Sequence, residues 1–106
     1  MSEYLVFKRS LPYGLRVKFC LYHFLLFLYS EVFDRGPISR KEVEEIASKA
    51  LRRWDLDINP REFVDEALKQ KYLLRVEDGL RLDYLGYLFL KRGIDLTLRE
   101  MVGETS

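Results

Sequence analysis

The longest hydrophobic pattern in the chain lies between Leu15 and Phe33 and repeats at the period of an α-helix. Two apolar stripes run side by side along this helix, one made of Leu15, Phe19, Tyr22, Leu26, Tyr29 and Phe33, the other of Val17, Leu21, Phe24, Leu25, Leu28 and Val32. A more polar side carries Arg16, Cys20, His23, Phe27, Ser30 and Asp34. Gly36 and Pro37 end the predicted helix.

Two stripes are more than one helix needs in order to pack onto a small domain. The helix is therefore either central in the fold or shared with a second copy of the chain. We favour a homodimer, because 106 residues offer few other elements to cover so much apolar surface. The predicted interface residues are Phe19, Tyr22, Leu26, Phe27, Leu28 and Tyr29.

Two shorter helices follow, each with a clear start signal. Ser39 and Glu42 have the spacing of a capping box, and Asn59 can cap a third helix that has Pro60 at its first position. The turn "WDLDI" separates the two helices, and the third should run to about Gln70. The residues expected to face inward are Val43, Ile46, Ala47, Ala50 and Leu51 in the second helix, and Phe63, Val64, Ala67 and Leu68 in the third.

A β-hairpin and a last helix complete the predicted elements. Leu73 to Val76 and Leu80 to Asp83 read as short strands, joined by an "EDG" turn in which Gly79 tolerates positive φ. The Tyr- and Leu-rich stretch after them is a helix ending in Lys-Arg-Gly at 91–93. Leu96, Leu98, Met101 and Val102 could form a short closing helix that adds to the pairing of two copies. We predict one mainly α domain with a small β-hairpin (α+β), divided into an arm (1–13), a core (14–92) and a tail (93–106).

Composition narrows the function classes. The 18 basic and 17 acidic side chains give a net charge of +1, so any basic patch must be local. Cys20 is the only cysteine, which excludes an internal disulfide and fits a cytoplasmic location. Asn59 and Gln70 are the only side-chain amides, a composition typical of thermophiles. The apolar run at 19–29 is too short to span a bilayer, so no membrane association is expected.

The order of elements resembles the winged helix-turn-helix family, especially small archaeal and archaeal-virus members. The resemblance covers roughly Val17 to Arg92 and depends on this order and on the closing pattern "KQKYLLRVEDGLRLDYLGYLFLKRG". It implies that the helix from Pro60 to Gln70 enters the major groove of double-stranded DNA and that the hairpin wing, with its tip at Glu77 to Gly79, touches the backbone or minor groove.

The expected DNA contacts come from three elements. They are Arg61, Asp65, Lys69 and Gln70 on the reading helix, Lys41, Lys49, Arg52 and Arg53 on the helix before it, and Arg75 and Arg81 on the wing strands. The charge of the reading helix departs from that of a typical DNA reader, because residues 60–71 sum to zero and the wing tip carries Glu77 and Asp78. Carboxylates facing phosphates would reduce the gain from counterion release.

No constellation for catalysis stands out. His23 is the only histidine, and with Cys20 it forms neither a complete nucleophile pair nor a zinc site, so no enzyme activity, metal or cofactor is expected. Two hypotheses remain: a dimeric DNA-binding transcriptional regulator, which we favour, and a winged-helix module that binds another protein. The neutral third helix and the acidic wing tip are the evidence for the second.

Overall fold

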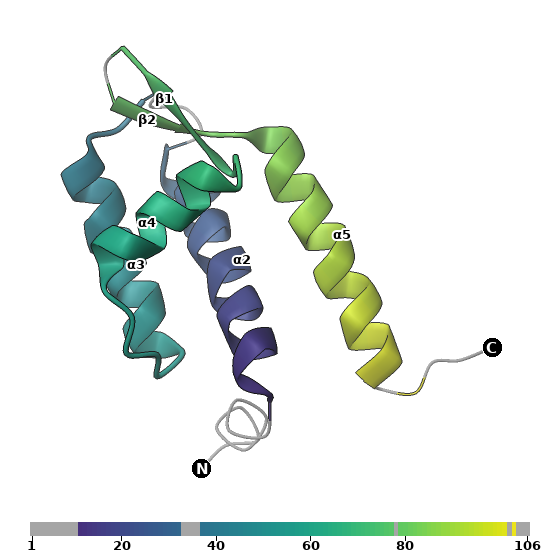
Figure 1. The fold of residues 1–106 in the computed structure, drawn as a ribbon. Helices are drawn as coiled ribbons and strands as arrows, with labels where there is room; N and C mark the ends of the chain where they lie inside the picture. The colour runs from purple at the N-terminus through teal and green to yellow at the C-terminus, as the bar shows by residue number, and fades with distance from the viewer. Residues whose placement is uncertain (1–10, 33–36, 78, 102, 104–106) are drawn as a thin grey trace.

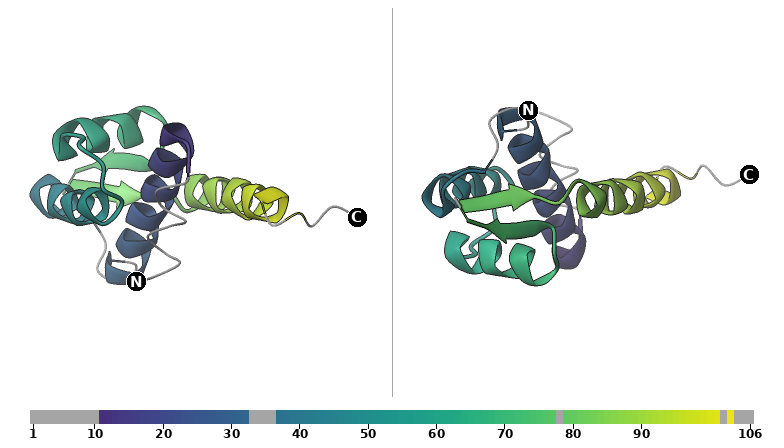
Figure 2. Two further views of the ribbon diagram at one scale, coloured as in Figure 1. Left: turned by 90° about the horizontal axis from the view of Figure 1, so that it is seen from below. Right: turned by 90° about the horizontal axis from the view of Figure 1, so that it is seen from above.

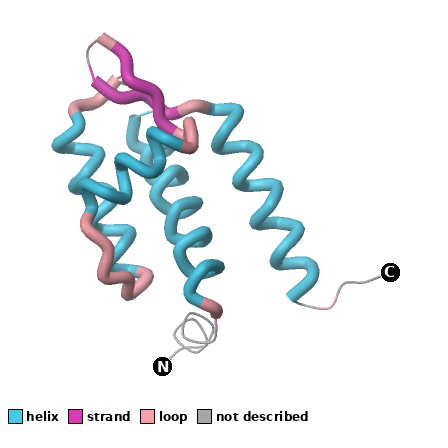
Figure 3. Tube along the Cα trace, in the orientation of Figure 1, coloured by secondary structure: helices cyan, strands magenta, loops and turns pink. Residues whose placement is uncertain are grey.

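The computed structural model describes residues 11–32, 37–77, 79–101 and 103, and this part of the chain is mainly helical. Its elements, labelled as in Figure 1, are α2 (Tyr13–Val32), α3 (Arg40–Arg53), α4 (Pro60–Lys69), β1 (Leu73–Val76), β2 (Gly79–Leu82) and α5 (Tyr84–Met101). The two strands form one antiparallel hairpin, which is the only sheet among the described residues (Figure 3). The predicted α+β class, with a long first helix and a small hairpin, is confirmed. Gly36, the predicted helix terminator, lies outside the described residues.

Helix α2 is the central element. It lies between α3 on one side and α5 on the other, with the hairpin across one end (Figure 1). Both of its apolar stripes are used within a single chain. Phe24, Leu25 and Leu28 of one stripe are buried in the core, and Tyr22 and Tyr29 of the other receive the ring of Tyr87 on α5 at centroid distances of 6.0 and 5.5 Å. The stripe that holds the two tyrosines therefore does not require a second copy of the protein to cover it.

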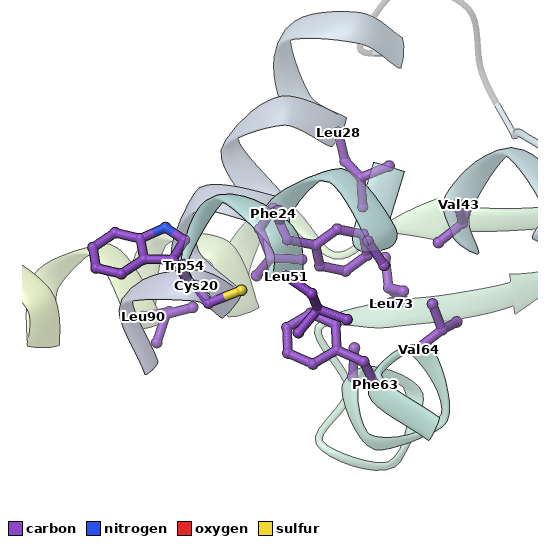
Figure 4. Close-up of a cluster of buried hydrophobic side chains, with 14 of the residues drawn as sticks. Cys20, Phe24, Leu28, Val43, Leu51, Trp54, Phe63, Val64, Leu73 and Leu90 are labelled. Carbon is purple, nitrogen blue, oxygen red and sulfur yellow. The ribbon is translucent and has the colours of Figure 1, made fainter. Parts of the chain in front are cut away.

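The core gathers side chains from every described element. Phe24 is fully buried and meets the ring of Phe63 on α4 edge-on at 5.4 Å, while Leu28, Val43 and Leu73 are buried beside it (Figure 4). Cys20 is also fully buried, although the helical pattern placed it on the more polar side of α2. Trp54, from the end of α3, covers that side and stacks on Phe19.

The predicted start signals of α3 and α4 are confirmed. The Ser39 hydroxyl accepts a hydrogen bond from the backbone N–H of Glu42, and the Asn59 side chain accepts one from the N–H of Arg61. These bonds satisfy N–H groups that have no partner inside the helix. Pro60 occupies the first turn of α4, as expected.

Both helices end in the same way, through a residue with positive φ. Lys71 has φ +65°, and around it the N–H of Tyr72 bonds the carbonyl of Ala67 while the N–H of Lys71 bonds that of Leu68. This pair of bonds is the Schellman arrangement, which glycine usually closes. Asp55, with φ +58°, closes α3 through the equivalent bonds. The left-handed backbone conformation of Lys71 costs free energy. The tight link from α4 into β1 holds the residue in this conformation.

The hairpin is joined to the segment before α3. Ile38 and Leu80 exchange two backbone hydrogen bonds of 3.0 and 2.8 Å, so Ile38 continues the antiparallel ladder for one residue. Gly79 lies against this bridge with φ +146°, and a Cβ at that position would be 2.3 Å from the carbonyl oxygen of Ile38. Glycine is needed here both for its backbone conformation and for the close approach.

Helix α5 corrects the prediction that the last helix ends at Lys-Arg-Gly. It continues without a break through Gly93 to Met101, so the predicted core (14–92) and tail (93–106) share one helix. The physical reason is that the apolar period continues: Ile94 is buried and Leu98 is half-buried in line with Tyr87 and Leu90. A glycine inside a helix costs only about 1 kcal/mol, which this packing outweighs. Val102 lies outside the described residues.

None of the helices in the described ranges combines the length and apolar character needed to cross a membrane.

Replacing Gly79 with alanine should destabilise the protein by about 2 kcal/mol or more, because the new Cβ meets the Ile38 carbonyl and the backbone is left in a strained conformation. Thermal or urea unfolding measures this. Gly93→Ala is the control, because nothing lies within 4 Å of the added methyl group and the helix should gain roughly 0.5–1 kcal/mol. Equal stability of the two variants would contradict the contact between Gly79 and Ile38.

Lys71→Gly should stabilise the protein by about 1 kcal/mol, because glycine adopts positive φ without the penalty that a side chain carries. Lys69→Gly is the matched control. It makes the same change two residues earlier, in the last turn of α4, and should destabilise by about 1 kcal/mol. A loss of stability in Lys71→Gly would show that the Schellman ending of α4 is wrong.

Candidate nucleic-acid interface

The exposed face of α4 carries a single line of charged residues. Arg61, Asp65 and Lys69 stand four residues apart and are exposed, whereas Phe63 and Val64 point into the core. Glu62 and Glu66 lie on a flank of the helix, where they border an apolar cavity of about 170 Å³ between α4 and the first half of α2. The two glutamates are thus displaced from the Arg61–Lys69 line, and only Asp65 lies on it.

Gln70, also predicted to point outward, is exposed and lies on the flank beside Glu66. Its side-chain amide donates a hydrogen bond to the carboxylate of Glu66 at 3.0 Å, and it borders the same apolar cavity. The pair fixes the carboxylate of Glu66 on the side of α4 that faces α2.

Arg40, at the start of α3, binds the one acidic residue of the line. Its Nη2 donates to Oδ1 of Asp65 at 2.6 Å and to the backbone carbonyl of Arg61 at 3.1 Å, and its Nε donates to Glu44 at 2.8 Å. The bonds to Glu44 and Asp65 raise the pKa of Arg40. Arg40 therefore partly offsets the negative charge of Asp65, since it also binds Glu44, and it ties α3 to the first half of α4.

Only half of this arrangement can be predicted from the sequence. Arg40 and Glu44 are four residues apart on one helix and so form a pair that can be read from spacing. Asp65 is 25 residues from Arg40, and no local pattern links them. The Arg40 contact could be found only once α3 and α4 were placed together.

The basic residues predicted on α3 lie on more than one side of it. Lys41, Lys49 and Arg52 are exposed and share its solvent face, with Glu45 among them. Lys41 and Arg61 also border one shallow depression between α3 and the start of α4, so the structure brings these two together. Arg53 lies to the side of α2, where its charge acts on His23.

Arg75 and Arg81, both exposed, lie on opposite faces of the hairpin. Arg75 is opposite Leu80 in the strand register, and Arg81 is opposite Leu74. Directly opposed residues of an antiparallel pair point to the same face, and neighbours along a strand alternate. Arg75 therefore shares the face on which Leu80 packs into the core, and Arg81 is on the other face. A flat partner that lies on one face of the hairpin cannot contact both arginines.

The six residues predicted to form a dimer interface on α2 are mostly covered within the chain. Phe19 and Leu28 are 5% and 1% exposed, so they belong to the core and not to a surface. Tyr22 and Tyr29 pack on α5, and Phe27 stacks on His23 at 4.6 Å. Only Leu26 is exposed, at 37%. The reason for the correction is that α5 packs on the stripe of Tyr22 and Tyr29, which sequence periodicity could not reveal.

Cys20 and His23 have structural environments. Burial raises the pKa of the Cys20 thiol to about 12, the opposite of the lowered value that a nucleophilic cysteine needs. Nδ1 of His23 accepts a hydrogen bond from the indole N–H of Trp54 at 3.1 Å, which joins α2 to the end of α3. Among the described residues, no group of three or more His, Cys, Asp and Glu side chains could hold a metal ion.

Stability should fall as the pH is lowered from 7 to 5. Burial, and secondarily the positive charge of Arg53, lowers the pKa of His23 below its ordinary value of 6.5. The unfolded chain therefore takes up a proton first, so the stability contributed by neutral His23 is present above about pH 6.5 and is lost as the pH falls through the folded-state pKa. Protonation of Nδ1 would also break the bond from Trp54.

Urea unfolding at a series of pH values measures this effect. His23 is the only histidine, so His23→Asn, which keeps an acceptor for the indole, should flatten the profile between pH 5 and 7. A wild-type profile that is already flat in this range would contradict the assigned environment.

Comparisons of the chain with protein-family models, with curated proteins and with solved structures found no significant match in any of the three.

Proposed function

We propose that the protein binds double-stranded DNA as a winged helix-turn-helix regulator, with α4 as the helix that enters the major groove. The observation that carries this proposal is the exposed line of Arg61, Asp65 and Lys69, in which Arg40 partly offsets the only acidic member. The element order supports it: α3 and α4 are joined by a short turn, and the hairpin follows α4 directly.

The charges of residues 60–71 sum to zero, but their arrangement on α4 favours nucleic-acid binding more than this sum suggests. The line on α4 holds two cations and one carboxylate, and this carboxylate binds Arg40, which also binds Glu44. Glu62 and Glu66 lie on the flank beside α2. A duplex that approaches the exposed face of α4 thus meets Arg61 and Lys69. This arrangement reduces one electrostatic objection to binding, the loss of counterion-release energy at acidic contacts.

Arg61 is the proposed base reader. It is exposed in the first turn of α4, where the N-terminal residues of a recognition helix contact base edges. An arginine there can bind O6 and N7 of guanine with two hydrogen bonds. Lys41, across the shallow depression from Arg61, together with Lys49 and Arg52, would contact phosphates from α3. The hairpin would add a backbone contact through one of its two arginines, since they point to opposite faces.

A protein-binding module is the second candidate function. Glu77, exposed at the end of β1, would face the backbone of a bound duplex if the wing tip reached it, and repulsion there weakens binding. The same residue suits a basic partner protein. The two candidate functions predict different changes in DNA affinity when the charges of α4 are altered.

Two neutral variants of α4 test the proposal, because each removes one negative charge from the same helix. Asp65→Asn removes the only carboxylate from the exposed line, leaves Arg40 bound to Glu44, and should tighten binding to any duplex at low salt by about two- to fivefold, which corresponds to roughly 0.5–1 kcal/mol. Glu66→Gln removes a charge from the flank and should change affinity less. Fluorescence anisotropy with a labelled duplex measures both.

Arg61→Ala should reduce discrimination between a selected site and random duplex by about 1–3 kcal/mol, more than it lowers non-specific affinity. Lys91→Ala, which removes a cation from α5, is the control and should leave both affinities unchanged. No detectable duplex binding by the wild-type protein at low salt would overturn the proposal. Equal effects of Asp65→Asn and Glu66→Gln would contradict the placement of α4 in the groove.

A further inference from the structure

Helix α5 has two apolar faces, and only one of them is covered by other elements in the part of the chain that the structure describes. Tyr87, Leu90 and Ile94 are buried against α2, the helix that α5 packs on. In both views of Figure 2, α5 stands to one side of the remaining elements and extends away from them. The opposite face holds Phe89 and Leu85, which are 77% and 67% exposed.

The exposed face forms a regular seam. Leu85, Phe89, Arg92, Leu96 and Arg99 are spaced by four, three, four and three residues, which is the spacing of the contact positions in paired helices. Leu88, also exposed, borders the seam on one side. The seam runs almost the full length of the helix, about 27 Å for 18 residues.

The size of the apolar surface suits a helix partner. Leu85, Leu88, Phe89 and Leu96 together expose on the order of 400 Å², a patch in the range that is often functional on small proteins. With the aliphatic stems of Arg92 and Arg99 added, a helix lying along this seam approaches the ~800 Å² that each partner buries in a standard interface.

The charges on the seam point to a second copy of the same chain, in the antiparallel direction. Arg92 and Asp95 lie three residues apart near the middle of α5, and both are exposed on the same edge. A parallel pair in register would place Arg92 beside Arg92. A two-fold axis passing between residues 92 and 95 instead brings Arg92 of each copy beside Asp95 of the other.

The same axis matches the apolar positions. In this register, Phe89 of one copy lies between the levels of Leu96 and Arg99 of the second copy, and the symmetric contacts form on the other side of the axis. The seam residues of the two helices then alternate in level along the pair, as interdigitating side chains require. A surface that complements itself in this way is what a two-fold dimer interface demands.

We propose that the protein forms a homodimer through antiparallel pairing of the outer faces of α5, with Phe89 and Leu96 as its apolar centre and Arg92 and Asp95 as reciprocal ion pairs. The interface is separate from the line of charges on α4. It also differs from the α2 surface that the sequence pattern favoured.

Sedimentation equilibrium of the full chain tests the proposal. The wild-type protein should be a dimer at micromolar concentration, and Phe89→Glu should raise the dissociation constant roughly thirtyfold or more, the loss typical of a central aromatic contact. Because Phe89 is exposed, the variant should keep the helical circular dichroism of the wild type. Leu96→Glu provides a second variant with the same expected result.

Leu26→Glu is the matched control, since Leu26 is an exposed leucine on α2 and should leave the dimer intact. A charge exchange tests the orientation: Arg92→Asp places two carboxylates together and should weaken the dimer about tenfold, whereas the double variant Arg92→Asp with Asp95→Arg should restore it. A monomeric wild type at 100 µM, or a dimer lost in Leu26→Glu and kept in Phe89→Glu, would overturn the proposal. Failure of the double variant to restore pairing would overturn the antiparallel register.

Discussion

The burial of α2 between the α3–α4 pair and α5 is the interaction on which the rest of the structure depends. Phe24 and Leu28 are buried on the side of α3, α4 and the hairpin, and Tyr22 and Tyr29 hold the ring of Tyr87 on the other side. Phe63 meets Phe24, and this contact turns the opposite face of α4 to solvent. The orientation of the Arg61–Lys69 line is therefore a consequence of core packing and not of the charges themselves.

Sequence reasoning succeeded where the signal is local. The caps at Ser39 and Asn59, the proline at the start of α4 and the glycine of the hairpin each depend on backbone chemistry within a few residues, and all are present in the structure. The inward faces of α3 and α4 also follow the predicted periodicity, with only Ile46 and Leu68 half-buried.

It failed where a partner had to be identified. Periodicity shows that a helix has an apolar face but not what covers it. The predicted dimer interface on α2 therefore includes Tyr22 and Tyr29, which α5 covers within the same chain. The glycine at 93 was read as a helix end because the buried positions that continue the helix, Ile94 and Leu98, gain their meaning from contact with α2. The bond from Arg40 to Asp65 is non-local for the same reason.

The two faces of α5 are also under different selective constraints. Substitutions at Tyr87, Leu90 or Ile94 disturb the core and are constrained by folding, whereas the exposed positions at 85, 89 and 96 are free of that constraint. If two copies pair through this outer face as proposed, daughter proteins formed by gene duplication could stop pairing with each other through a few changes there, while retaining the same core and the same exposed line on α4. The attachment of α5 by one side makes its association preferences evolvable independently of its fold.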